Sequence, residues 1–187
     1  MAKKAQSTLP NMLLSLTAIA LVAAAALAAV NAVTQEPIAQ AQEAKVQAAI
    51  KAVLPDFAKL EDRDVDGKLC HIGYDAEGNF VGAAVEAGSD AGFGGHLQLM
   101  VGFDKDGKVY GYNILETHET PGLGAKAGEW FQKGGKGDII GKAPAAAALN
   151  VKKDGGDVDA ISGSTITSRA FLGTVNSAAE VFSNITI

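Results

Sequence analysis

The sequence predicts an α+β domain that follows a single N-terminal transmembrane helix. Three features support this fold class. The chain has no charged residue from Ala5 to Gln35, a glycine-containing pattern typical of β-hairpins then occurs twice, and the C-terminal stretch is amphipathic with helical spacing. Roughly 150 residues follow the apolar stretch, which is enough for one domain with one hydrophobic core.

The N-terminal apolar stretch has the length of a membrane span. Its most apolar part, Leu13 to Val33, would form a helix of roughly 31 Å, close to the thickness of a bilayer core. Lys3 and Lys4 precede it and an acidic region follows, so the positive-inside tendency places the N-terminus in the cytoplasm. We expect a cytoplasmic N-terminus at 1–8, a transmembrane anchor at 9–35 and an extracytoplasmic domain at 36–187. A cleaved signal peptide is the alternative, although this apolar segment is longer than is usual for one.

The residues after the anchor predict a helix followed by antiparallel hairpins. Apolar residues from Ile38 to Val53 fall near helical spacing, with Pro37 suited to a first turn and Pro55 to the end. The stretches "IGYDAEGNFVG" at 72–82 and "VGFDKDGKVYG" at 101–111 then share one pattern. Each contains an Asp-x-x-Gly turn between runs of strand-forming residues, so we expect two β-hairpins in a small antiparallel sheet.

The C-terminal half predicts mostly short elements before one long helix. We expect a short helix near 125–132, a turn or short helix from Pro144, and a strand, turn and strand at 150–161. From Thr165 to Phe182 apolar residues recur at helical spacing, which predicts an amphipathic helix.

Charge and cysteine content exclude several functions. Two of the 16 Lys and Arg residues precede Glu36, so the remainder has 14 basic and 21 acidic residues. This balance argues against binding nucleic acid. The lone Cys70 forms no internal disulfide and no metal site by itself, and we expect it to be a small core residue.

A cluster of hydroxyl side chains marks the start of the last predicted helix. Five of the seven residues from Ser162 to Ser168 are Ser or Thr, and Gly163 lies among them. Unpaired N–H groups and the positive end of the helix dipole make this position suitable for a phosphate. A plain alternative is that a serine caps the helix and the rest is solvated loop. No Walker-type phosphate loop or G-x-S-x-G nucleophile motif is present.

Two motifs resemble those of one known family. "DAISGST" at 159–165 is similar to the flavinylation motif Asp-x-x-(Ser/Thr)-Gly-Ala-Thr, in which the last Thr is esterified to the phosphate of FMN. "HETPGLG" at 118–124 resembles the flavin-proximal loop of the same FMN-binding family. With the N-terminal anchor, the pair resembles the G subunits of Rnf electron-transport complexes. One departure is visible, because the Ala of the family motif is Ser164 here.

The resemblance implies a set of cofactor-binding residues. Thr165 would bear covalent FMN, and Asp159 would belong to the sequence recognised by a flavin transferase. The phosphate would be lined by Ser162, Gly163 and Ser164. Against the isoalloxazine ring would lie Glu119, Thr120, Leu123 and Gly124, with Trp130 a further candidate. No catalytic acid or base and no metal ligand is expected, because electron transfer requires neither.

The function implied is that of an electron-carrier subunit. In Rnf complexes electrons move between ferredoxin and NAD and are coupled to sodium or proton movement. This chain would pass electrons to neighbouring membrane and peripheral subunits in the cytoplasmic membrane of a bacterium or archaeon, and would not itself bind ferredoxin, NAD or nucleic acid. The C subunit of sodium-translocating NADH:quinone reductase, which has the same motifs, is the nearest alternative. A non-covalent flavin-binding module and a pilin-like structural protein are more distant ones.

Overall fold

A computed structural model describes residues 8–185 of the chain. Its first element is a long helix, α1 (Leu9–Val53), and the chain divides into two compact units, Met1–Ala44 and Lys45–Ile187. We call the second unit the head. The two units are described separately below.

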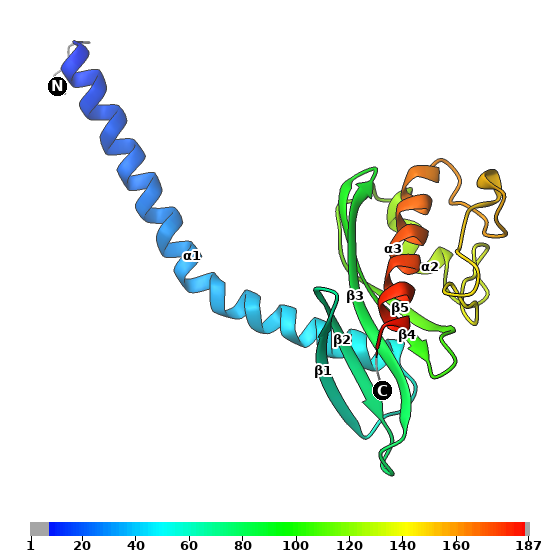
Figure 1. The fold of residues 1–187 in the computed structure, drawn as a ribbon. Helices are drawn as coiled ribbons and strands as arrows, with labels where there is room; N and C mark the ends of the chain where they lie inside the picture. Colours follow the sequence, from blue (N-terminus) through cyan, green and yellow to red (C-terminus); the bar gives the residue numbers. More distant parts are fainter. Residues whose placement is uncertain (1–7, 186–187) are drawn as a thin grey trace. The chain divides into compact units, whose positions relative to one another are not determined.

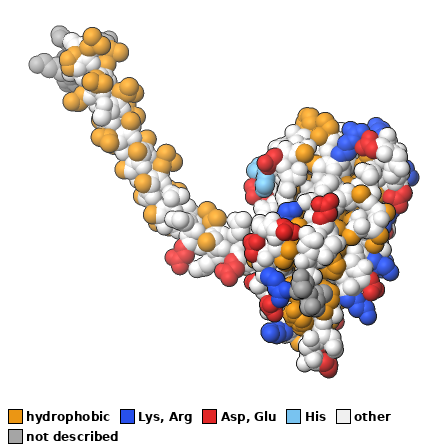
Figure 2. All heavy atoms as spheres, in the orientation of Figure 1, with side chains coloured by type: hydrophobic (Ala, Val, Ile, Leu, Met, Phe, Trp, Pro, Cys, Tyr) orange, Lys and Arg blue, Asp and Glu red, His pale blue; other side chains and the backbone are white. Residues whose placement is uncertain are grey.

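The described part of the first unit is the apolar portion of α1. Within residues 8–185, α1 is the helix long and apolar enough to cross a membrane, and none of its most apolar window is buried. Figure 2 shows hydrophobic side chains gathered along this part of the helix. Residues such as Leu14, Leu21 and Val33 therefore require an apolar environment that the chain does not supply.

The head is built on a five-stranded antiparallel sheet in the order β1-β2-β3-β4-β5 (Figure 1). The bounds are β1 Lys59–Val65, β2 Lys68–Tyr74, β3 Phe80–Gly92, β4 Gly95–Asp104 and β5 Val109–Thr117. Each strand pairs with the next in sequence. The sheet is thus a simple meander, and the predicted α+β class is confirmed.

The two hairpins predicted from the repeated pattern are both present. The first joins β2 to β3 and the second joins β4 to β5. In each turn the Asp side chain accepts a backbone hydrogen bond. Asn79 N–H donates to Asp75 Oδ1 (2.7 Å), and Lys108 N–H donates to Asp104 Oδ1 (3.0 Å). Strand β1 was not predicted, because its sequence KLEDRDV is too polar to show an apolar alternation.

Helices pack on both faces of the sheet. The C-terminal helix α3 (Thr165–Ser183) covers one face, where Phe171 lies between Phe131 (centroids 4.4 Å apart) and Tyr112 (4.8 Å). The last turns of α1 cover the other face, where Ile50 and Val53 are fully buried. The remaining short elements are η1 (Gly124–Lys126), α2 (Ala127–Trp130) and η2 (Lys152–Asp154).

Three sequence-based expectations need comment. Pro37 lies inside the continuous helix α1 rather than at the start of a separate helix, so its ring interrupts one backbone hydrogen bond without ending the helix. The predicted strands at 150–161 are wrong, because only Val151 and Val158 form an isolated bridge and η2 lies between them. Cys70 is a buried core residue as expected, and burial raises the pKa of its thiol to about 11.

The contact between β4 and the end of α1 depends on a glycine. A Cβ at Gly102 would overlap the carbonyl oxygen of Val53. We expect Gly102→Ala to lower the free energy of unfolding of the head by about 1–3 kcal/mol, as overpacking does. Chemical denaturation of the full chain in detergent, followed by the fluorescence of the single Trp130, measures this.

Gly173→Ala is the matched control for this substitution. Gly173 is in α3 with open space around its Cβ position, so alanine there should stabilise the helix by about 0.5–1 kcal/mol. Equal changes in the free energy of unfolding for the two substitutions would show that the close contact at Gly102 does not make alanine destabilising there.

Candidate functional site

The hydroxyl cluster forms the N-terminus of α3. Thr165 is the first residue of the helix and Ser164 occupies the N-cap position, but no side chain there makes a capping hydrogen bond. Just before the helix, Gly163 adopts a φ of 77°, a left-handed conformation that favours glycine. The cap function expected under the plain alternative is thus absent, and the first-turn N–H groups keep their capacity to bind an anion.

Ser168 fixes the backbone around this N-terminus. Its hydroxyl is fully buried, accepts the N–H of Ile161 (2.9 Å) and donates to the carbonyl of Ser164 (2.9 Å). One hydroxyl of the cluster is therefore structural. Two of the others, Ser164 and Thr165, line the cavity described below.

The second motif forms a tight turn beside this helix start. Pro121 and Gly122, with φ 77° at the glycine, form a turn closed by the Leu123 N–H bonding to the Thr120 carbonyl (3.1 Å). Gly124 then approaches α3 so closely that a Cβ there would overlap the Glu119 carboxylate and lie 2.9 Å from Thr167 Oγ1. Glycine is thus required for the loop and the helix start to meet.

A cavity of about 370 Å³ lies between these segments. Its lining residues are Phe93, Glu119, Thr120, Leu123, Gly124, Lys153, Gly163, Ser164, Thr165 and Ile166. The volume is within the range of small-molecule sites. The cavity therefore joins the two motifs that the sequence analysis singled out separately.

Most of the residues expected from sequence line this cavity, and two do not. Ser162 is exposed in the turn before the helix and is absent from the lining. Trp130 lies elsewhere, where its Nε1–H donates to the carbonyl of Asp159 (2.8 Å) and Lys136 lies over its ring. Trp130 therefore holds the first residue of the 159–165 segment and does not contribute to the cavity wall.

Three lining residues were missed by the sequence analysis. Phe93 is at the turn between β3 and β4, Ile166 is in the first turn of α3, and Lys153 is in η2. The segment of Lys153 is tied to α3 by a two-point ion pair between Asp154 and Arg169, both contacts 2.7 Å. No local pattern marks these residues, because each reaches the cavity only through tertiary packing.

Buried polar atoms without partners point into this region. Three buried side-chain atoms of the described residues make no hydrogen bond: Glu119 Oε1, Thr167 Oγ1 and, on the sheet, His71 Nε2. Glu119 is 8% exposed and Thr167 is fully buried. Such groups destabilise a protein unless a ligand or water satisfies them. The site combines the first-turn N–H groups of α3, the cationic Lys153 and the apolar Leu123 and Ile166. This combination fits a ligand that has a phosphate and a flat, partly polar ring.

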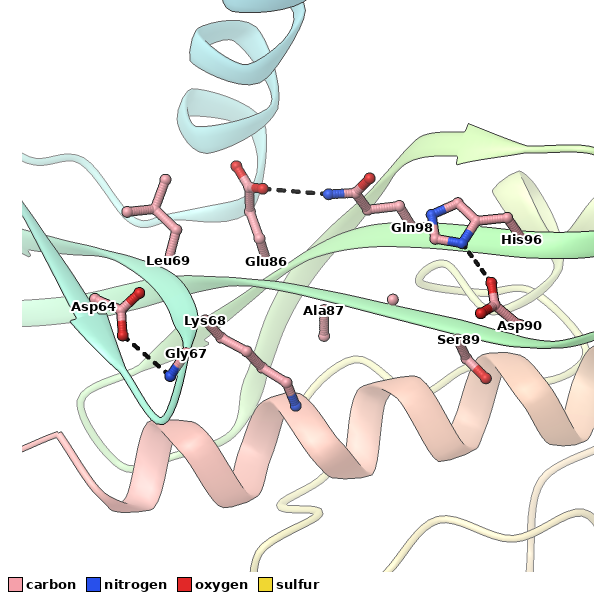
Figure 3. Close-up of a pocket in the computed structure, with 11 residues that line it drawn as sticks. Asp64, Gly67, Lys68, Leu69, Glu86, Ala87, Ser89, Asp90, His96 and Gln98 are labelled. Atoms are coloured by element: carbon pink, nitrogen blue, oxygen red, sulfur yellow. Dashed lines mark hydrogen bonds and ion pairs between the residues drawn. The ribbon is translucent and has the colours of Figure 1, made fainter.

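A second cavity, of about 500 Å³, lies where β3 continues past the start of β2, beside the turn between β1 and β2 (Figure 3). Its polar side chains bond to each other: His96 Nδ1 is 2.7 Å from Asp90 Oδ1, and Gln98 Nε2 donates to Glu86 Oε2 (3.3 Å). These groups are already paired, and none of the motif residues lines this cavity. The site at α3 is therefore the better candidate for a cofactor.

Comparisons with known proteins agree with this geometry. The family of FMN-binding domains matches residues 92–180, a range that contains every residue lining the cavity at α3. This match indicates an FMN-binding domain within the head and supports FMN as the cofactor.

Relatives over nearly the whole chain identify the family more closely. The chain is 34% identical to the G subunit of the Na(+)-translocating ferredoxin:NAD(+) oxidoreductase complex of Acetobacterium woodii, over 92% of this chain and 90% of that protein. It is 34% identical to the G subunit of the ion-translocating oxidoreductase complex of Methanosarcina acetivorans, over 92% and 94%. The corresponding G subunit of Escherichia coli is 36% identical over 81% and 80%. The chain belongs to this family of G subunits of ion-translocating oxidoreductase complexes.

One buried histidine on the sheet gives a pH-dependent prediction. His71 Nδ1 is 2.6 Å from Asp62 Oδ1 and Nε2 is 3.6 Å from Glu86 Oε1. Burial alone would lower the pKa of His71, but the carboxylates of Glu86 and Asp62 beside its ring outweigh this effect and raise the pKa above its usual value. Protonated His71 therefore stabilises the head below about pH 6.5, and this contribution is lost as the pH rises through the folded-state pKa.

We expect the difference in unfolding free energy between wild type and His71→Gln to shrink as the pH increases from 6 to 9. Denaturation curves followed by Trp130 fluorescence at several pH values measure it. His118→Gln, at an exposed histidine, controls for the loss of one imidazole. A difference that stays constant with pH would contradict the proposed charge on His71.

Proposed function

We propose that the head carries FMN linked through its phosphate to Thr165 and relays electrons within a membrane-bound oxidoreductase complex. The observation that carries the proposal is the position of Thr165 at an uncapped helix N-terminus that opens into a cavity with unsatisfied buried oxygens. The phosphodiester is an anion, which the first-turn N–H groups and the helix dipole stabilise at this place.

The chain's own residues divide between the two ends of the cofactor. Gly163 and Ser164 lie beside the phosphate, and the ammonium group of Lys153 supplies an opposite charge there. Glu119, Thr120, Leu123 and Gly124 lie against the ring, where polar groups and backbone N–H groups set its potential. The flavin supplies the capacity to accept and release electrons, and the protein holds it in place and controls its surroundings.

The relay would serve the complex rather than a soluble substrate. Relatives of this chain are named as subunits of complexes that translocate ions, one of them with ferredoxin and NAD(+) as reactants. We infer that this chain passes electrons to neighbouring membrane and peripheral subunits of such a complex. A flavin transferase would install the FMN, reading the sequence that includes Asp159. The relatives' names favour this assignment over the C subunit of an NADH:quinone reductase.

We propose that α1 anchors the chain as a single span at about residues 9–35, with the head on the extracytoplasmic side. The exposed apolar surface of α1 supports the span. The two lysines before the span and the acidic head support the orientation. Covalent attachment suits such a location, since a released cofactor would be lost by diffusion.

Thr165→Ala should abolish covalent flavin because the acceptor hydroxyl is removed. The chain is expressed with and without a flavin transferase, and a denaturing gel is scanned under ultraviolet light. We expect a fluorescent band that requires both the transferase and Thr165.

Ser164→Ala, which restores the family's alanine, is the matched control and should remain fluorescent. Lys153→Ala should give a weaker band, because the phosphate loses a cationic neighbour. A Thr165→Ala band as bright as wild type would exclude the ester at Thr165.

The orientation can be tested with introduced cysteines. Native Cys70 is buried, and the raised pKa of its thiol, about 11, keeps it unreactive at neutral pH. A membrane-impermeant maleimide should label Glu77→Cys, in an exposed turn of the head, in intact cells, and Lys4→Cys only after permeabilisation. Labelling in the reverse order would place the head in the cytoplasm.

A further inference from the structure

Exposed apolar side chains gather at the mouth of the cavity. In the described part of the head, five large apolar residues are strongly exposed: Leu69, Phe93, Tyr110, Leu123 and Ile166. Three of these five line the cavity at α3. They come from three separate segments, so their convergence is a property of the tertiary structure and indicates a ligand or partner surface.

Phe93 is the most exposed of the three, at 72%, and forms the tip of the hairpin between β3 and β4. Glycines surround it at positions 92, 94 and 95. A large aromatic side chain at the end of a glycine-containing turn is costly to leave in water. Its position therefore calls for a reason other than packing of the core.

The glycines hold the turn tightly against the wall of the cavity. A Cβ at Gly92 would lie 2.6 Å from the carbonyl oxygen of Gly95 and 2.8 Å from Glu119 Oε1. A Cβ at Gly94 would overlap the His118 carbonyl and lie 2.9 Å from the Cα of Glu119. The turn is thus packed on the backbone of the loop at 118–124, which places Phe93 beside the cavity.

We propose that Phe93 covers the isoalloxazine ring of the bound flavin and shields it from water. This inference rests on the proposed function, because it requires a flavin in the cavity. Leu123 and Ile166 form the apolar surface around the ring, and the aromatic side chain of Phe93 packs on its flat face. Aromatic rings favour offset stacking or edge contacts with each other, which a flat three-ring system offers over a large area.

The structure favours a role for Phe93 in covering the flavin ring over a role in docking a neighbouring subunit. The residue lines the cavity itself, and its turn is fastened to the residue whose unsatisfied carboxylate oxygen is buried beside the same cavity. A docking role predicts that Phe93 has no effect on the flavin until a partner binds. A covering role predicts an effect in the isolated chain.

The test measures how accessible the flavin is to a neutral quencher. Full-length chains are co-expressed with a flavin transferase, purified in detergent, checked for a fluorescent band on a denaturing gel and titrated with acrylamide. Phe93→Ala should raise the quenching constant of the flavin fluorescence by roughly 2- to 10-fold, the change expected when one aromatic contact of ordinary strength is lost.

Tyr110→Ala is the matched control, because Tyr110 is also an exposed aromatic residue but does not line the cavity. Phe93→Leu is measured in parallel and decides the question if the alanine variant takes up no flavin. Unchanged quenching in the fluorescent Phe93 variants, or an equal rise in Tyr110→Ala, would overturn the covering role alone. A dark wild-type band would overturn the proposed function and this inference together.

Discussion

The packing of α3 on the sheet is the constraint on which the site depends. Phe171 lies between Phe131 and Tyr112 at centroid distances of 4.4 and 4.8 Å, and the hydroxyl of Tyr112 donates to the carbonyl of Ala127 (2.6 Å). These contacts join the helix, the sheet and the segment after the flavin-proximal loop in one core. Because a helix is rigid, fixing its middle also fixes where Thr165 lies at its N-terminal end.

Glycines allow the backbone segments around the site to approach one another closely. Gly124 lets the loop at 118–124 reach the first turn of α3, and Gly92 and Gly94 let the hairpin tip reach the same loop. Three segments that are far apart in sequence thereby enclose one cavity (Figure 1 shows the hairpin and the helix side by side). In the structure these glycines are positions where two backbone segments approach too closely for a side chain.

An electron carrier of this kind needs positioning more than reactive side chains. The polar groups of this region include two buried atoms without hydrogen-bond partners, Glu119 Oε1 and Thr167 Oγ1, and Lys153, which lines the cavity with Glu119. In a poorly hydrated site such groups act strongly on a bound charge. The apolar part of α1 fits a membrane location, and the rest of the chain carries more acidic than basic residues.

The sequence by itself determined the features that are encoded locally. The apolar stretch, the Asp-x-x-Gly turns and the spacing of Phe171 and Val175 predicted an apolar N-terminal helix, two hairpins and the last helix, because each depends on residues near one another in the chain. The continuation of α1 through Pro37 was not predicted. The hydroxyl cluster and the Pro-Gly turn likewise marked both sides of the cavity. Local patterns failed at two places. The sequence of β1 is polar and its strand forms by pairing with β2, and at 150–161 the two expected strands are reduced to a single bridge between Val151 and Val158.

Only the tertiary structure decided which residues share the site. It brought Phe93, Lys153 and Ile166 to the cavity, and placed Trp130 against the backbone of Asp159 instead. It also left the N-cap of α3 without a side-chain hydrogen bond, so the first-turn N–H groups keep the capacity to bind an anion. The physical reason is that these outcomes depend on contacts between distant segments, and the packing of α3 and the glycine contacts that create them have no signature in local sequence.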